Sequence, residues 1–182
     1  MESFYLGNFD YVSTINITLT NWEYWIRRAN WFFYRELYED WIPVFSNSYA
    51  TYWEKSDDAK NAIVKDDITV TIENAEGGGK NIVVETKEDV SGIADVYIDY
   101  RVSKDDSLKS KLIWNMAARI MDCSMEINQT LLDFNYIRAE GQEFIPIEVI
   151  NGKGTVNICS YPEEGTMLQI NKAECERIFR VE

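Results

Sequence analysis

The sequence predicts an α+β protein in which a mixed sheet packs with an aromatic helix and a long amphipathic helix. Three observations predict this fold class: several short segments of alternating apolar and polar residues, a tryptophan- and tyrosine-rich stretch at 22–53, and an apolar repeat between residues 108 and 134. The 182 residues are 46% apolar, which is enough for one good core. We therefore expect a main domain over residues 1–138 and a small β-rich unit over 139–182.

The N-terminal part of the chain is predicted to form a strand followed by a helix. Residues 11–20 alternate between apolar and polar side chains, which is the period of a half-buried strand. Thr20 and Glu23 have the spacing of a capping box, in which each side chain satisfies a backbone N–H of the first helical turn. A helix is therefore expected over residues 22–40, and Pro43 ends it.

The middle of the chain is predicted to change from helix to strands. Residues 44–65 are expected to be helical, with an N-cap at Ser56. Residues 68–72 alternate in the manner of a strand, and an apolar run at 82–84 follows a turn of three glycines, so the two segments predict a β-hairpin. Residues 93–102 predict a third strand.

The longest helix is predicted between residues 105 and 134. Its apolar residues step by three or four positions and fall on one stripe: Leu108, Leu112, Met116, Ile120, Cys123, Ile127, Leu131 and Phe134. Asp105 and Asp106 precede this stripe, where carboxylates suit the N-cap and the helix dipole. We expect this helix to pack in the main domain.

After residue 136 the sequence changes to short strands and tight turns. Strands are expected at 144–150, 155–159 and 167–170, joined by hairpin turns that contain glycine. A last turn of helix is expected at 172–178. Short strands at this spacing predict a small barrel-like unit.

Composition excludes several classes of chemistry. The chain has 31 acidic residues against 18 basic ones, a formal net charge of −13, and no histidine. The acidic excess disfavours direct nucleic-acid binding, and the missing histidine excludes Ser-His-Asp and Cys-His catalysis. The three cysteines are far apart, so reduced thiols are expected rather than a metal site. No cofactor, export signal or membrane-spanning run is expected, which favours a cytoplasmic protein with no membrane partner.

The aromatic helix has a second apolar face. A helical projection places four aromatic residues nearly opposite its other apolar positions: Trp31, Tyr34, Tyr38 and Trp41. A surface helix needs one apolar face, so the second is either buried between two layers or binds a partner. Tryptophan, tyrosine and the interleaved arginines are typical of binding hot spots. We therefore name these four residues as candidates for a protein partner or a homodimer contact.

Carboxylates are concentrated between residues 57 and 89, where lysines are few. Such a stretch is either a solvated surface or a surface that imitates phosphates and complements the field of a basic partner. The candidate partner-binding residues are Asp57, Asp58, Asp66, Asp67, Glu73, Glu76, Glu85, Glu88 and Asp89. Further along, Asp95 and Asp99 share one face of a predicted strand.

One constellation resembles the metal site of the PD-(D/E)xK nucleases. Asp67 opens a strand, a glycine-rich hairpin follows, and an E-x-K triplet at Glu85 and Lys87 closes the next strand. In that family the carboxylates hold magnesium and the lysine helps to activate water, so the resemblance implies a magnesium-dependent nuclease. The family's proline is absent before Asp67. Residues 90–102 are predicted as loop and strand where the family has a helix.

These features favour a stoichiometric binding protein over an enzyme. Small size, charge of one sign and the lack of a catalytic set resemble, in overall character, phage and mobile-element inhibitors of host defence, including anti-CRISPR proteins. That class shares no diagnostic motif. The resemblance implies inhibition of a basic nucleic-acid-handling protein, with a Cas nuclease as the expected target. The alternatives are the nuclease described above and a toxin-immunity protein, which would bind a different basic partner.

Overall fold

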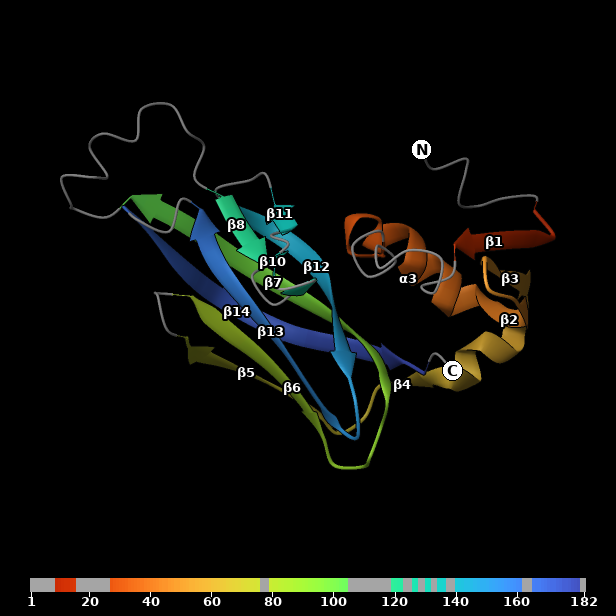
Figure 1. Cartoon of the computed structure of the whole chain (residues 1–182). Coiled ribbons are helices and arrows are strands. Elements are labelled where there is room, and N and C mark those ends of the chain that lie inside the picture. The colour runs from red at the N-terminus through yellow and green to blue at the C-terminus, as the bar shows by residue number, and fades with distance from the viewer. Residues whose placement is uncertain are drawn as a thin grey trace.

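The computed structural model describes residues 9–15, 27–75, 79–104, 119–122, 126–127, 130–131, 134–136, 140–161 and 165–180. Within these residues the protein is mostly β, and the predicted α+β fold class is wrong. Two antiparallel sheets pack face to face, and a helix and a smaller sheet lie at one end of them (Figure 1).

The elements follow one another along the chain in this order: β1 (Tyr11–Ile15), α3 (Trp31–Asp40), β2 (Trp41–Ser46), β3 (Ala50–Lys55), the 3-10 helix η1 (Asp57–Ala62), β4 (Ile63–Val64), β5 (Ile68–Asn74), β6 (Lys80–Thr86), β7 (Gly92–Lys104), β8 (Arg119–Asp122), β9 (Glu126–Ile127), β10 (Thr130–Leu131), β11 (Phe134–Tyr136), β12 (Glu140–Val149), β13 (Lys153–Tyr161) and β14 (Thr166–Phe179).

The two large sheets combine strands from both ends of the chain. The five-stranded sheet has the order β11-β8-β13-β6-β5, and the four-stranded sheet has the order β12-β7-β14-β4. β13 pairs with β6 and β8, and β7 lies between β12 and β14. The described strands after residue 138 therefore complete the sheets of the preceding strands and form no separate sheet.

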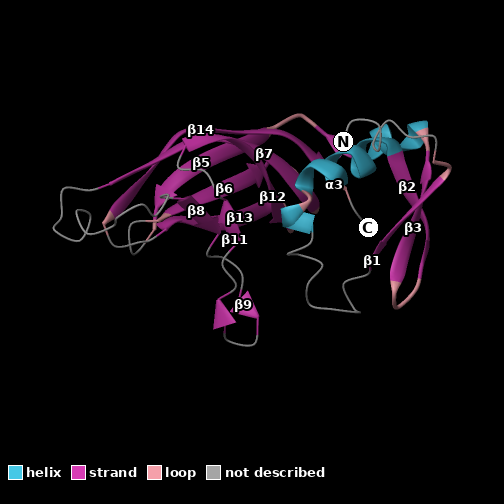
Figure 2. Ribbon diagram, turned by 90° about the horizontal axis from the view of Figure 1, so that it is seen from above, coloured by secondary structure: helices cyan, strands magenta, loops and turns pink. Residues whose placement is uncertain are grey.

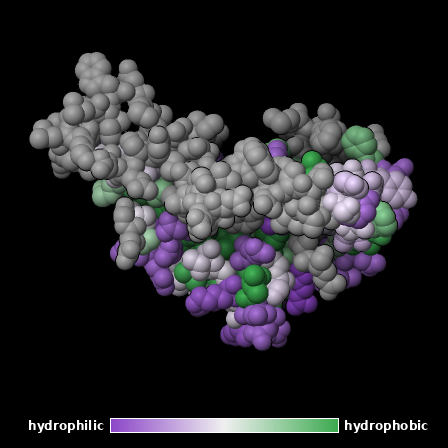
Figure 3. Space-filling model, viewed as in Figure 1, coloured by the Kyte–Doolittle hydropathy of each residue, from purple (hydrophilic) through white to green (hydrophobic). Residues whose placement is uncertain are grey.

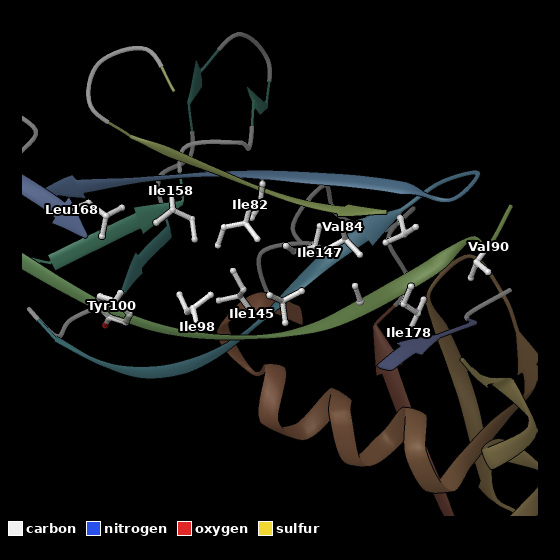
Figure 4. Close-up of a cluster of buried hydrophobic side chains, with 14 of the residues drawn as sticks. Ile82, Val84, Val90, Ile98, Tyr100, Ile145, Ile147, Ile158, Leu168 and Ile178 are labelled. Atoms are coloured by element: carbon white, nitrogen blue, oxygen red, sulfur yellow. The ribbon is translucent and has the colours of Figure 1, made fainter. Parts of the chain in front are cut away.

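The main core lies between these two sheets. Because successive side chains of a strand point to opposite faces, alternate residues of β6, β7, β12 and β13 face inward (Figure 4). The inward residues with the largest fully buried side chains include Ile82, Ile98, Tyr100, Ile145, Ile147 and Ile158. Burying each aliphatic side chain of this size contributes about 1.5–3 kcal/mol, so this layer dominates the stability of the sandwich.

A tight turn carries the chain from one sheet to the other. Asn151 and Gly152 both have positive φ angles, of 50° and 81°, the combination found in type I′ turns. The predicted turn is confirmed, and Ile150 and Lys153 pair across it, but beyond this bridge β12 belongs to one sheet and β13 to the other. A Cβ atom at Gly154 would lie 2.3 Å from the carbonyl oxygen of Glu148, so this corner requires a glycine.

The predicted strands are confirmed where the structure describes them. β5 and β6 form the predicted hairpin, with Ile68 opposite Thr86. β7, β12, β13 and the first part of β14 lie where strands are predicted, and β1 confirms the first half of the predicted strand at 11–20. Alternation and turn chemistry, which are local signals, were sufficient for these elements.

The predicted long helix is wrong wherever the structure describes its sequence. Four residues of the apolar stripe lie in β8, β9, β10 and β11, in the order Ile120, Ile127, Leu131 and Phe134. The others lie outside the described residues: Leu108, Leu112, Met116 and Cys123. β8 pairs with β13, which is distant in sequence, so sheet pairing overrides a spacing that is also compatible with a helix.

Two further helices are corrected and one is shortened. Over 44–65, β2 and β3 form a hairpin, and Ser56 caps only the short η1, its Oγ accepting a hydrogen bond from the Asp58 N–H at 3.2 Å. The side chain of Asn47 accepts hydrogen bonds from two backbone N–H groups of the turn, a local signal that the helical prediction missed.

The helix predicted at 172–178 is wrong, because these residues continue β14 as strand. α3 confirms the second half of the helix at 22–40, and residues 27–29 are also helical. Residues 22–26 and both residues of the capping box, Thr20 and Glu23, lie outside the described residues.

Helix α3 lies between the sandwich and the three-stranded sheet β1-β3-β2 (Figure 2). Its Trp31 ring packs on Phe179 of β14, with ring centroids 6.1 Å apart. Its Tyr38 ring packs on Trp53 of β3 at 5.7 Å. These contacts form a second, aromatic core on the outer face of the four-stranded sheet.

A fully buried carboxylate ties α3 to this sheet. Asp95 of β7 is 0% exposed and accepts hydrogen bonds from Trp31 Nε1 at 2.9 Å and Arg35 Nε at 2.8 Å. Arg177 Nε of β14 donates to the same carboxylate at 3.3 Å, and Arg177 Nη1 lies 2.8 Å from Glu39 of α3. Burial acts to lower the pKa of Arg177, but the charges of Glu39 and Asp95 outweigh it and raise that pKa.

We predict that Asp95→Ala lowers the free energy of unfolding by about 3–5 kcal/mol, because it leaves two arginines and an indole N–H without their buried acceptor. Asp99→Ala is the matched control. Asp99 lies on the same face of β7, as predicted, but its hydrogen bond from Asn171 is exposed, so we expect a loss of about 1 kcal/mol or less. Urea denaturation measures both, and equal losses would contradict the role of Asp95.

Candidate functional site

The hairpin β5–β6 brings two acidic loops side by side. Since Ile68 pairs with Thr86, the loops at 65–67 and 87–91 leave the sheet next to each other, at the end opposite the glycine turn (Figure 1). They border a cleft of about 430 Å³, which we call the loop cleft, whose charged lining residues are Lys65, Asp66, Asp67, Lys87, Glu88 and Arg180. Figure 3 shows mainly hydrophilic residues at the lower tip of the molecule, where the loop at 87–91 lies.

The loop cleft is of mixed charge. Lys87 Nζ donates a hydrogen bond to Asp67 Oδ1, and both side chains are largely exposed. An exposed ion pair of this kind adds little stability, but it neutralises one carboxylate of the cleft. Arg180 is held at the cleft by its backbone N–H, which donates to the Ala62 carbonyl at 2.9 Å.

Two further candidate carboxylates lie on the outer face of the five-stranded sheet. Glu85 of β6 is opposite Lys153 of β13, with Oε1 and Nζ 2.8 Å apart. The pKa of Lys153 is raised, first by the hydrogen bond and charge of Glu85 and then by the charge of Glu73. Glu85 therefore pairs with a lysine, which Glu73 influences through its charge, and neither glutamate lines the loop cleft.

The remaining acidic candidates are spread around these two places. Asp57 and Asp58 are exposed in the first turn of η1, where Asp57 lies 3.7 Å from Lys60. Asp89 is exposed in the loop that borders the cleft. Glu76 lies outside the described residues. The described acidic candidates thus occupy three places: the loop cleft with its border, η1, and the outer sheet face.

The aromatic candidates lie mostly in the core. Trp31, Tyr34 and Tyr38 are only 3%, 4% and 6% exposed, because α3 turns them toward the sheets. Of the two alternatives for the second aromatic face, the structure shows burial for these three residues. Trp41 follows α3 in β2 and is half-buried beside an apolar pocket of about 280 Å³, which Phe33 also lines.

The nuclease-like constellation is only partly assembled. Asp67 and Lys87 are in contact, whereas the Glu85 carboxylate is held by Lys153. β7 follows the E-x-K triplet, where the nuclease family has a helix. Among the described residues, no three or more aspartate, glutamate or cysteine side chains are placed to hold a metal ion together.

The cysteines differ from one another. Cys159 of β13 is disulfide-bonded, so the expectation of three reduced thiols is wrong for this residue. Cys175 of β14 is a free, partly buried thiol. Burial, which is the largest contribution, raises its pKa from 9.0 to about 11.

Sequence reasoning named Lys87 of the loop cleft through the nuclease-like constellation, but it missed the other two cations of the cleft. Lys65 could have been placed there, because a hairpin joins the residues just before its first strand to those just after its second. Arg180 could not, since its position depends on the pairing of β14 with β4 across a long stretch of sequence.

Neither a model of a known protein family nor a curated protein matches this chain. In the described part of the chain, no helix has the length and apolarity needed to cross a bilayer. Function is therefore inferred from the charge, burial and chemistry of the residues alone.

We predict that Cys175 reacts slowly with iodoacetamide in the native protein. A pKa of about 11 in place of 9.0 leaves roughly 100-fold less thiolate at pH 8. Mass spectrometry of timed samples should show native alkylation slower by at least this factor than alkylation in urea, with a rate that keeps rising above pH 9. Cys175→Ser is the control that identifies the modified thiol, and equal rates in the native and unfolded states would contradict the burial.

Proposed function

We propose that the protein is a non-catalytic acidic binding protein that inhibits a basic nucleic-acid-handling protein, with a Cas nuclease as the best-fitting target. The observation that carries the proposal is the formal net charge of −13, from 31 acidic and 18 basic residues. A field of one sign accelerates encounter with a basic partner and disfavours acidic ones. The nucleic-acid channel of a Cas nuclease is positively charged and suits such a ligand.

The contact residues that we propose are Asp66, Glu88 and Asp89. All three are exposed, and they lie on two adjacent loops at the end of a rigid sandwich, where binding residues are commonly found. The loop cleft also presents Lys65 and Arg180, so its pattern of charge is not uniform. A mixed pattern sets the register of a complex, while the net charge supplies the long-range attraction.

The mechanism proposed is occupation of a cationic groove without chemical turnover. The partner would be met in the cytoplasm, where nucleases of host defence act. A toxin-immunity protein would use the same electrostatics on a different partner, so identification of the captured protein separates the two.

We predict that the protein forms a stoichiometric complex with a purified Cas nuclease and inhibits its DNA cleavage in proportion to the amount added. A panel of Cas9 and Cas12 enzymes, tested by size-exclusion chromatography and a cleavage assay, measures this. Because the attraction is electrostatic, the affinity should fall roughly tenfold or more between about 0.05 M and 0.5 M salt.

Charge reversal at Asp66 and Glu88 together, each to Lys, should weaken the complex, while the same change at Glu140 and Glu174 should have a much smaller effect. The control pair changes the net charge equally but lies on the four-stranded sheet, in exposed ion pairs with Arg101 and Lys172. Equal weakening by both pairs would contradict the proposed contact. Magnesium-dependent DNA cleavage by the protein itself, lost in Glu85→Ala, would contradict the proposed function.

A further inference from the structure

The three-stranded sheet β1-β3-β2 has one face that packs on α3 and another that the rest of the described residues leave exposed. Directly paired residues of antiparallel strands share a face, and β3 pairs Tyr52 with Ser13 of β1 and with Phe45 of β2. Tyr11 and Ile15 lie two residues on either side of Ser13, so they share this face as well. We call Tyr11, Ile15, Phe45 and Tyr52 the apolar sheet face.

The opposite face of the same sheet is covered. Trp53 and Val12 are directly paired and belong to the aromatic core beneath α3. Trp53 Nε1 donates to Thr14 Oγ1 at 2.9 Å within that layer. The sheet is therefore packed on one side only by the described residues.

The residues of the apolar sheet face are strongly exposed. Tyr11, Ile15, Phe45 and Tyr52 are 63%, 48%, 59% and 40% exposed, and the rings of Phe45 and Tyr52 lie 5.7 Å apart. Other exposed apolar residues flank the face: Phe9, Val44 and Tyr49. A contiguous exposed patch of this kind marks an interaction surface, whereas scattered single residues do not.

We propose that the apolar sheet face is the contact between two copies of this chain. Charge argues for this occupant. Among the described residues paired across this face, Glu54 is the charged one, although the whole chain has a net charge of −13. Two copies of so acidic a protein repel each other over most of their surfaces, and a nearly uncharged face is where they can meet. A basic partner would instead be drawn to the carboxylates.

Face-to-face contact is favoured over pairing at the β2 edge of the sheet. Pro43 lies in the edge strand β2, and a bulge between Pro43 and Phe45 interrupts the register with β3. Proline and bulges both prevent an edge from accepting another strand. Two sheet faces related by a two-fold axis pack with their strands nearly aligned, and each copy then offers the same apolar residues to the other.

The area of the face sets the strength of the contact. Strands of five and six residues, rising about 3.4 Å per residue and spaced about 4.8 Å apart, give a face of roughly 250 Å². Side chains and flanking residues about double the accessible area, so two copies would bury about 1,000 Å² in total. This is the lower limit for a specific interface, and the dimer should depend on concentration.

Analytical ultracentrifugation of the full chain between about 5 and 500 µM tests the proposal. The weight-average mass should rise from that of the monomer toward twice that value. Phe45→Asp and Tyr11→Asp should each raise the apparent Kd at least tenfold. Ile150→Asp is the matched control, since Ile150 is 60% exposed but lies at the turn between the two large sheets. Circular dichroism checks the fold, and Tyr11→Asp carries the test if Phe45→Asp unfolds.

Three results would overturn the proposal: a monomer at every concentration, a dimer that both face variants leave intact, or an equal effect of Ile150→Asp. If the wild type is monomeric and binds phosphatidylcholine vesicles in a Phe45-dependent manner, the occupant is a lipid surface and the dimer is wrong. Salt separates this inference from the proposed function. Added salt should weaken a complex with a basic protein but should not weaken the dimer, because it screens the repulsion between like-charged copies.

Discussion

The buried carboxylate of Asp95 constrains the whole arrangement around α3. A fully buried charge is tolerated only when donors surround it, and here they come from two elements, α3 and β14. Meeting that requirement fixes the position of the helix on the four-stranded sheet. The helix in turn covers Ile93 and Phe179 and receives Trp53 of the small sheet. The small sheet is therefore positioned through the helix by an electrostatic requirement as well as by apolar packing.

This arrangement decides which residues remain available for recognition. Trp31 and Tyr38 have the composition of a binding hot spot, yet their burial makes them part of the scaffold. The surfaces that remain are loops and sheet faces. In the loop cleft, carboxylates alternate with lysines and an arginine, so the acidic excess of the chain acts as a long-range field there and not as a local block of negative charge. The net charge of the chain thus supplies the long-range attraction to a basic partner, and the mixed charges of the loop cleft set how the two proteins align.

The sequence was informative where the determinants are local. Alternation and turn chemistry predicted the β5–β6 hairpin and the turn at Asn151, and the hairpin alone brings Asp66 close to Glu88. Prediction failed at one local hairpin, β2–β3, whose turn signal at Asn47 was missed, and it failed where pairing is distant. The stripe through Ile120 satisfies helical spacing, but β8 pairs with β13, and no local signal reveals this. For the second aromatic face of α3 the sequence left burial and partner binding open, because the residues that cover it, such as Asp95 at Trp31 and Phe179 at Tyr38, lie far along the chain.

The strand period also shows why the small sheet needs a second layer. In β3, Trp53 and Tyr52 are neighbours, so one aromatic residue points to each face. A sheet with one wet face normally alternates apolar and polar residues, and apolar residues on both faces are typical of a sheet covered on both sides. Helix α3 covers the side of Trp53. The side of Tyr52, which Tyr11 and Phe45 share, has the composition of an inner face but is exposed in the single chain. The mismatch between composition and exposure is the physical reason to look for a partner there, and it is independent of the charge that the rest of the surface carries.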